Sequence, residues 1–322
     1  MDEEFTCDVN RAYRTACADL SEYEGTGYCV LHFPGEEKRE HFEQVKNSKL
    51  DQRDYDFGGT VFPEGTSDFR GREFDANTNF GGANFMGAAE FKHAQFSGGR
   101  TSFRGARFSG EQTFFDDAEF NGEWTSFHNA QFVGGGWASF RRVPFNTRDT
   151  SFLGTQFGSE RTDFLEAQFS GADTSFVGAQ FSSSRTLFKD AEFSSAWTSF
   201  RRAQFNNAEV YFQEATFTEE VDFIEATFKG KVSFLGSKGN SVFDYGAWAR
   251  FNHSRIENPE QFAFNTVLLH PGWFCNTDVR KVAFTNVKWY GMPGGLKGTL
   301  DKEIHTLQAR DVESPHTLRL CP

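Results

Sequence analysis

Phenylalanine recurs at fixed intervals through more than half of this chain. Between residues 57 and 234 the spacing alternates between five residues and about seven, so a unit of about twelve residues holds two phenylalanines. The central part of the series reads Phe103, Phe108, Phe115, Phe120, Phe127, Phe132, Phe140, Phe145, Phe152 and Phe157. An amphipathic helix needs apolar positions at steps of three and four, so this spacing argues against helices.

The residue two positions before each phenylalanine is also restricted in type. It is mostly alanine before the second phenylalanine of a pair, as at Ala106, and threonine or valine before the first, as at Thr101. Residues two apart on an extended segment point the same way, so each segment turns one small and one large side chain inward. Regular self-similarity without a helical period predicts a solenoid of short strands and turns.

The repeated units read FRGARFSG at 103–110, FVGAQFSS at 176–183, FKDAEFSS at 188–195 and FQEATFTE at 212–219. This pattern resembles the pentapeptide-repeat family, whose unit is a small residue, any residue, a central Leu or Phe, and two polar or small residues. The resemblance covers Tyr55 to about Phe234. It implies an all-β fold, a right-handed quadrilateral β-helix with the central Phe and the preceding Ala inside.

One feature departs from the family pattern, because every second step has one or two extra residues. We infer that alternate corners are wider, with about 24 residues per coil and between seven and eight coils over 57–234. At a strand spacing of about 4.8 Å, these coils form a rod roughly 35–40 Å long. Each buried phenylalanine contributes roughly 1.5–3 kcal/mol, so about thirty stacked rings would supply the core.

The sequence divides into four parts. We expect an N-terminal cap at 1–50, regular coils at 51–234, degenerate terminal coils at 235–290, and a loop and tail at 291–322. Residues 34–49 read as a helix within the cap, with an acidic first turn and with Lys46 and Lys49 in the last turn. Phe42 and Val45 of this helix are expected to face the solenoid, because an uncovered terminal coil exposes strand edges.

Three cysteines and a histidine in the cap are candidate metal ligands. Cys7, Cys17, Cys29 and His32 give the spacing C-x9-C-x11-C-x2-H. Three thiolates and an imidazole are a tetrahedral zinc set, and a small region with few apolar residues would need such a site to fold. The prediction is a structural zinc ion, since four protein ligands leave no open position; free thiols in a short cap are the alternative.

Charge and composition restrict the setting. The net charge of −12 argues against direct binding of nucleic acid through phosphates. No run of eighteen apolar residues is present, so we expect no membrane-spanning segment, and the acidic start MDEEFTCDVN is unlike a secretory signal. Five cysteines without a dense pattern indicate a reducing, cytoplasmic setting.

Two groups of surface residues are candidates for contact with a partner. Trp124, Trp137 and Trp197 lie at related positions in the seven-residue steps, and we expect them to line up along one corner. Large aromatic residues at such positions are frequent in binding hot spots, although packing at the corner would equally explain them. The second group is an acidic cluster in the late coils, formed by Glu219, Glu220 and Asp222.

No catalytic constellation stands out in the sequence, so we expect no enzyme. The main hypothesis is a non-enzymatic scaffold that binds a protein partner; homo-oligomerisation is left open. The family resemblance adds a second hypothesis, a mimic of duplex DNA that binds DNA gyrase or another topoisomerase. The third is a recognition or assembly arm of a longer protein, because the chain ends at LRLCP without a helix stop or charged tail.

Overall fold

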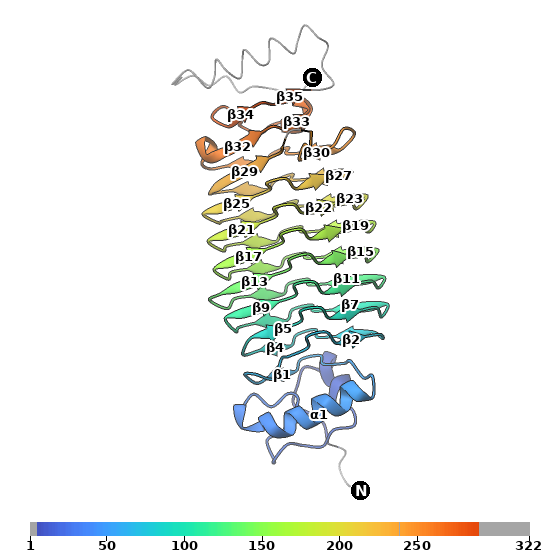
Figure 1. The fold of residues 1–322 in the computed structure, drawn as a ribbon. Helices are drawn as coiled ribbons and strands as arrows, with labels where there is room; N and C mark the ends of the chain where they lie inside the picture. Colours follow the sequence, from blue (N-terminus) through green and yellow to red (C-terminus); the bar gives the residue numbers. More distant parts are fainter. Residues whose placement is uncertain (1–4, 238, 290–322) are drawn as a thin grey trace.

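The computed structural model describes residues 5–237 and 239–289. A helical cap lies at the N-terminal end and is followed by a stack of coils (Figure 1). The coils form a parallel β-solenoid of about ten turns, as the phenylalanine spacing predicted. Each regular coil contributes one short strand to each of four parallel sheets, which confirms the four-sided β-helix.

Sheets 1 to 4 are numbered in the order in which each coil from β4 onward visits them. Sheet 1 contains β1 (Val61–Phe62), β4 (Asn84–Phe85), β8 (Arg107–Phe108), β12 (Gln131–Phe132), β16 (Gln156–Phe157), β20 (Gln180–Phe181), β24 (Gln204–Phe205), β28 (Thr227–Phe228) and β31 (Arg255–Ile256). Sheet 2 contains β5 (Ala89–Glu90), β9 (Gln112–Phe114), β13 (Trp137–Ser139), β17 (Arg161–Asp163), β21 (Arg185–Leu187), β25 (Glu209–Tyr211), β29 (Lys231–Leu235), β32 (Phe262–Asn265) and β34 (Ala283–Thr285).

Sheets 3 and 4 complete the four sides. Sheet 3 contains β2 (Glu73–Phe74), β6 (Gln95–Phe96), β10 (Glu119–Phe120), β14 (Pro144–Phe145), β18 (Gln168–Phe169), β22 (Glu192–Phe193) and β26 (Thr216–Phe217). Sheet 4 contains β3 (Thr78–Asn79), β7 (Arg100–Ser102), β11 (Trp124–Ser126), β15 (Asp149–Ser151), β19 (Asp173–Ser175), β23 (Trp197–Ser199), β27 (Glu220–Asp222) and β30 (Trp248–Arg250). Sheets 2 and 4 therefore lie on opposite sides of the coil.

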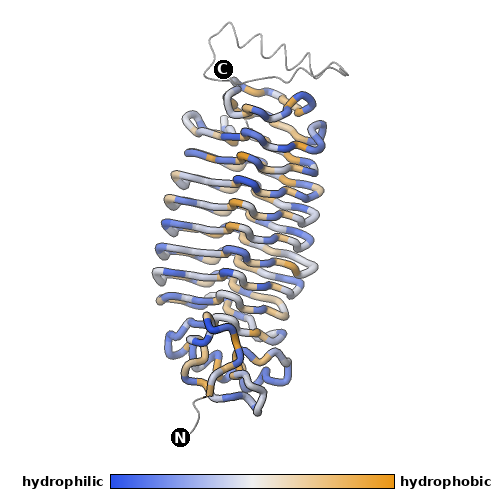
Figure 2. Tube along the Cα trace, turned by 180° about the vertical axis from the view of Figure 1, so that it is seen from behind, coloured by the Kyte–Doolittle hydropathy of each residue, from blue (hydrophilic) through white to orange (hydrophobic). Residues whose placement is uncertain are grey.

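The core consists of phenylalanine rings stacked from coil to coil. Phe103 lies parallel to Phe127 with 4.9 Å between ring centroids, and Phe127 repeats this spacing with Phe152. Rings from different sides of the coil meet edge to face, as Phe103 and Phe115 do at 5.3 Å and 88°. These rings are fully buried, and hydrophobic residues recur at regular intervals along the coils (Figure 2). Both ring geometries are favourable for aromatic pairs, so the coil spacing and the ring stacking reinforce each other.

Two kinds of corner alternate around each coil. The narrow corner follows the first phenylalanine of a pair and is closed by a backbone hydrogen bond, such as Ala106 N to Phe103 O at 3.0 Å. Its third residue has a positive φ, as at Gly105 (65°) and Asn129 (55°). The wide corner precedes sheets 2 and 4 and contains the extra residues. Several wide corners bring a glycine against the backbone of the preceding coil.

The cap ends in a helix that covers the first coil. The cap contains the 3-10 turns η1 (Arg11–Cys17) and η2 (Glu36–Lys38) and helix α1 (Arg39–Asp51). The predicted helix is therefore confirmed, with shifted ends. Phe42 packs on Phe62 with 5.4 Å between centroids, and Val45 is partly buried against the core. Lys46 and Lys49, which the sequence places near the end of this helix, are buried.

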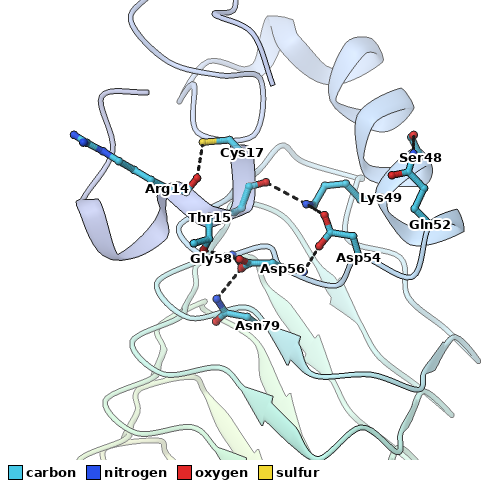
Figure 3. Close-up of polar contacts among 11 residues, drawn as sticks. Arg14, Thr15, Cys17, Ser48, Lys49, Gln52, Asp54, Asp56, Gly58 and Asn79 are labelled. Atoms are coloured by element: carbon cyan, nitrogen blue, oxygen red, sulfur yellow. Dashed lines mark hydrogen bonds and ion pairs between the residues drawn. The ribbon is translucent and has the colours of Figure 1, made fainter. Parts of the chain in front are cut away.

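Both lysines bind the first coil and the chain beside it. Lys46 Nζ donates to Thr66 O at 2.6 Å and lies 5.7 Å from the Phe69 ring. Lys49 donates to Ala16 O at 3.1 Å and pairs with Asp54 (Figure 3). Lys49 Nζ also lies 5.8 Å from the centroid of the Phe57 ring, so both ammonium groups lie over rings of the first coil while they reach polar partners.

Residues 235–289 contain the last described strands. Strands β30, β31 and β32 extend sheets 4, 1 and 2, and β33 (Leu268–Leu269) pairs with β35 (Lys288–Trp289) beside them. Two short 3-10 turns, η3 (Pro259–Gln261) and η4 (Pro271–Phe274), interrupt the strands. The predicted loop and tail at 291–322 lie outside the described residues.

Two neighbouring glycines provide a test of the wide corner. A Cβ at Gly134 would overlap with the carbonyl oxygen of Gly110 in the preceding coil, whereas nothing lies within 4 Å of a Cβ at Gly135. We expect Gly134→Ala to lower the free energy of unfolding by about 1–3 kcal/mol, because the coils must move apart or bend. Gly135→Ala is the matched control, expected within about 0.5 kcal/mol of the parent. Urea unfolding measures both, and equal stability of the two variants would contradict the proposed close contact.

Candidate metal centre and exposed tryptophans

The four predicted metal ligands come together in the cap. Cys7 precedes η1 and Cys17 ends it, while Cys29 forms a β-bridge with Glu22 and His32 lies in the following turn. All four side chains are buried, and one ligand atom from each lies within 4.8 Å of the others. His32 Nδ1 lies 3.4 Å from the Cys7 sulfur and 3.1 Å from the Cys29 sulfur. These residues are therefore close enough to hold a metal ion.

The other nitrogen of His32 fixes the orientation of the ring. His32 Nε2 lies 2.8 Å from Gly58 O in the first coil, and only a protonated Nε2 can donate to that carbonyl. The lone pair of Nδ1 then points at the sulfur atoms, as metal-binding histidines require. Next to it, Val61 N donates to Leu31 O at 2.9 Å, so the backbone between Cys29 and His32 is bonded directly to the coils.

The three thiols are not equivalent. The Cys17 thiol and the neighbouring His32 lower the pKa of Cys29 to about 4 despite its burial. Burial raises the pKa of Cys7, and the neighbouring Cys29 raises the pKa of Cys17, whose thiol donates to Arg14 O at 3.5 Å (Figure 3). A metal ion that binds the three sulfur atoms would displace the protons that the thiols carry.

The three tryptophans singled out in the sequence lie on two opposite sides of the solenoid; Trp137 and Trp197 are exposed, and Trp124 is partly exposed. Trp124 in β11 and Trp197 in β23 belong to sheet 4, whereas Trp137 in β13 belongs to sheet 2. The expectation that all three line up along one corner is therefore wrong. The register of sheet 4 adds Trp248 in β30, which the sequence analysis did not single out. We call the outer side of sheet 4 with Trp124, Trp197 and Trp248 the Trp face.

The comparisons with known proteins agree with this architecture. A family model described as pentapeptide repeats, in nine copies, matches residues 188–238. The same phenylalanine spacing and the same four sheets continue from the matched segment back to the first coil. Residues 188–238 therefore match the pentapeptide-repeat family, as the sequence pattern predicted. No curated protein matches the chain. No solved structure matches it either.

The three acidic residues of the late coils do not form the cluster expected from the sequence. Glu219 is exposed, but Glu220 pairs with Arg250 of the next coil. Asp222 is buried, accepts a hydrogen bond from Ile224 N at 2.6 Å, and has its pKa raised by burial. Of the three, only Glu219 is thus fully available to a partner.

Shallow hollows lie beside two of the tryptophans of the solenoid. The hollow beside Trp124 is lined by Arg100, Glu123, Arg148 and Asp149. The hollow beside Trp137 is lined by charged residues of both signs, and the Arg161 guanidinium lies 4.9 Å from the Trp137 ring. On the Trp face, Arg250 lies 5.4 Å from the Trp197 ring while it pairs with Glu220. Both sides therefore combine an aromatic surface with charged groups.

Among residues 5–237 and 239–289, no helix has both the length and the apolar character needed to cross a membrane.

Proposed function

We propose that this protein is a non-enzymatic scaffold that binds a protein partner on its Trp face. Pentapeptide-repeat solenoids are generally structural or interaction proteins. The coils are filled by stacked phenylalanine rings, which leave the outward side chains to contact other molecules. A rigid rod with flat sides suits the presentation of surface residues at a fixed spacing.

The tryptophans of the Trp face are the observation that carries this proposal. Trp197 is 42% exposed and Trp248 is 47% exposed, although tryptophan is normally far more buried. Asp149 and Asp173 lie between Trp124 and Trp197 in the same register column of sheet 4. A protein partner can remove water from an exposed tryptophan ring and form hydrogen bonds with the polar groups beside it. Such tryptophans are the usual anchors of a protein interface.

Mimicry of duplex DNA is less well supported. Such a surface needs a continuous line of negative charge, but arginines neutralise acidic groups along the solenoid. Arg142 pairs with Asp117 at 2.7 Å, Arg202 pairs with Glu225 at 2.6 Å, and Arg250 pairs with Glu220. These ion pairs link successive coils and divide the negative charge into short stretches.

The matched pair Trp197 and Trp137 tests which side binds the partner. Their exposed fractions are 42% and 43%, and they lie on opposite sheets. We expect Trp197→Ala to weaken partner binding by about 2 kcal/mol, or about thirtyfold, and Trp137→Ala to leave it unchanged. A partner captured from a cell lysate would be purified and titrated against both variants by calorimetry. Loss of binding with Trp137→Ala alone would move the interface to sheet 2, and capture of a topoisomerase by both variants would favour DNA mimicry.

We further propose that the cap holds a structural zinc ion on Cys7, Cys17, Cys29 and His32. Thiolate and imidazole donors favour zinc among the common divalent ions, and four protein ligands leave no position for a substrate. A bound ion would tie the loop before η1, the end of η1 and the turn at His32 to one point. Its effect would be to hold the cap against the first coil through the bonds at Gly58 and Val61.

His32 and His41 distinguish a metal site from unrelated thiols. His32→Ala removes a proposed ligand, whereas His41 is exposed and lies outside the four-residue set. We expect one zinc per chain in the parent and in His41→Ala, and none in His32→Ala, by elemental analysis. At free zinc 1,000 times the Kd, binding stabilises the fold by about 4 kcal/mol, so a chelator should lower the Tm of the parent and of His41→Ala but not that of His32→Ala. Lower pH should weaken binding because the thiols regain protons. A parent protein without metal would contradict the proposal.

A further inference from the structure

The side chain of Lys38 is fully buried inside the cap. Lys38 ends η2, and its exposed fraction is 0%. Its ammonium group donates to Leu31 O at 2.9 Å and lies 4.8 Å from the centroid of the Phe42 ring. Leu31 stands between Cys29 and His32 in the sequence, so the ammonium is bonded to the backbone that carries two of the candidate metal ligands.

Lys38 differs from the other buried lysines of the cap in lacking a carboxylate partner. Lys46 pairs with Glu43 at 2.8 Å, and Lys49 pairs with Asp54. No ion pair between Lys38 and a carboxylate is present among the described residues. Glu36, a nearby acid, is bonded to Arg39 at 3.0 Å on the surface. A buried cation without an opposite charge is costly, so this position requires an explanation.

The charge of a metal centre would supply that explanation. Burial lowers the pKa of Lys38 to about 7, and the negative charge of Cys29 is the largest influence acting in the opposite direction. Three thiolates, one neutral imidazole and a divalent ion sum to a net charge of −1. One lysine ammonium neutralises that sum, so the buried cap would then carry no net charge.

We propose that Lys38 is the counterion of an anionic zinc–thiolate centre formed by Cys7, Cys17, Cys29 and His32. This inference rests on the zinc site proposed above. Lys38 is a positioning residue in this role: it touches no metal, and it acts by stabilising the thiolates that do. A single buried ammonium group also fits a divalent ion better than a monovalent one. A centre of Cu⁺, three thiolates and a neutral imidazole has a net charge of −2, and Lys38 would neutralise only one of these charges.

Lys38→Gln and Lys46→Gln provide a matched test on the full chain. Glutamine can still donate to a backbone carbonyl, but it carries no charge. Zinc affinity is measured by competition with a chromophoric chelator, and cobalt(II) absorption reports thiolate coordination. We expect Lys38→Gln to weaken zinc binding at least tenfold, as loss of an outer partner of a metal ligand does, and Lys46→Gln to change it less than threefold. Equal affinity of the two variants would overturn the proposal.

A second background separates charge from packing. Replacing Cys7 by His gives a centre of two thiolates and two imidazoles, which is neutral with zinc. In the Cys7→His background, Lys38→Gln should weaken binding less than threefold, and the difference measures the coupling. A tenfold loss in both backgrounds would show that Lys38 acts through packing, and would overturn its role as counterion.

Two further outcomes complete the test. If Lys38→Gln does not fold, Lys38→Arg keeps the charge and should bind zinc within about threefold of the parent; a tenfold loss with arginine would count against the proposal. A parent protein that binds neither zinc nor cobalt would remove the zinc site and the role of Lys38 together. A parent that binds both, with Lys38→Gln unchanged, would remove the role of Lys38 alone.

Discussion

The parallel stacking of one coil on the next is the constraint on which the rest of this structure depends. Backbone hydrogen bonds hold the strands of a sheet at about 4.8 Å, which is also a favourable distance between parallel aromatic rings. Phe127 can lie directly above Phe103 only because each coil returns to the same register on all four sides. Each narrow corner must then turn the chain within a few residues. Asn129 and Arg142 therefore accept a positive φ there, a conformation that glycine adopts more easily.

The same stacking leaves the first coil without a neighbour, and the cap supplies one. It does so with few apolar residues: Phe42 packs on one ring, and the ammonium groups of Lys46 and Lys49 lie over two others. A cap this small and polar buries little surface of its own. Its attachment to the coils therefore depends on specific bonds, such as those from His32 to Gly58 and from Val61 to Leu31. A metal ion at the four ligands would stiffen the segment from which these bonds come.

The sequence predicts the solenoid well because its core repeats. The phenylalanine spacing was sufficient to predict a solenoid and its inward residues, and the family resemblance implied its four sides. The cysteine and histidine types were sufficient to nominate the ligands that the fold brings together. The tryptophans were placed less well. Each coil has two equivalent wide corners, so Trp124 and Trp137 look alike in sequence, although thirteen residues is half a coil and puts them on opposite sides.

Other features depended on contacts that the sequence does not encode locally. Lysines near the end of a helix are usually solvated, and only the position of α1 against the rings buries Lys46 and Lys49. Trp248 was missed because the regular phenylalanine spacing ends after Phe234. Without that spacing, the sequence does not show which sheet Trp248 belongs to. Asp222 was predicted to be part of an acidic surface. In the structure its side chain is buried at the end of β27, and its carboxylate accepts a hydrogen bond from Ile224 N.

The register of sheet 4 also bears on why tryptophan stands where it does. The first outward position of successive strands is occupied by Arg100, Trp124, Asp149, Asp173, Trp197, Glu220 and Trp248. The coil therefore accepts a cation, an anion or an aromatic ring at this position without a change in backbone pairing. The inward positions show the opposite behaviour, with almost invariant phenylalanine and threonine. Backbone pairing therefore does not require tryptophan in the outer column, although two of its tryptophans have neighbours there: Trp197 lies against Arg250, and Trp248 lies against His270.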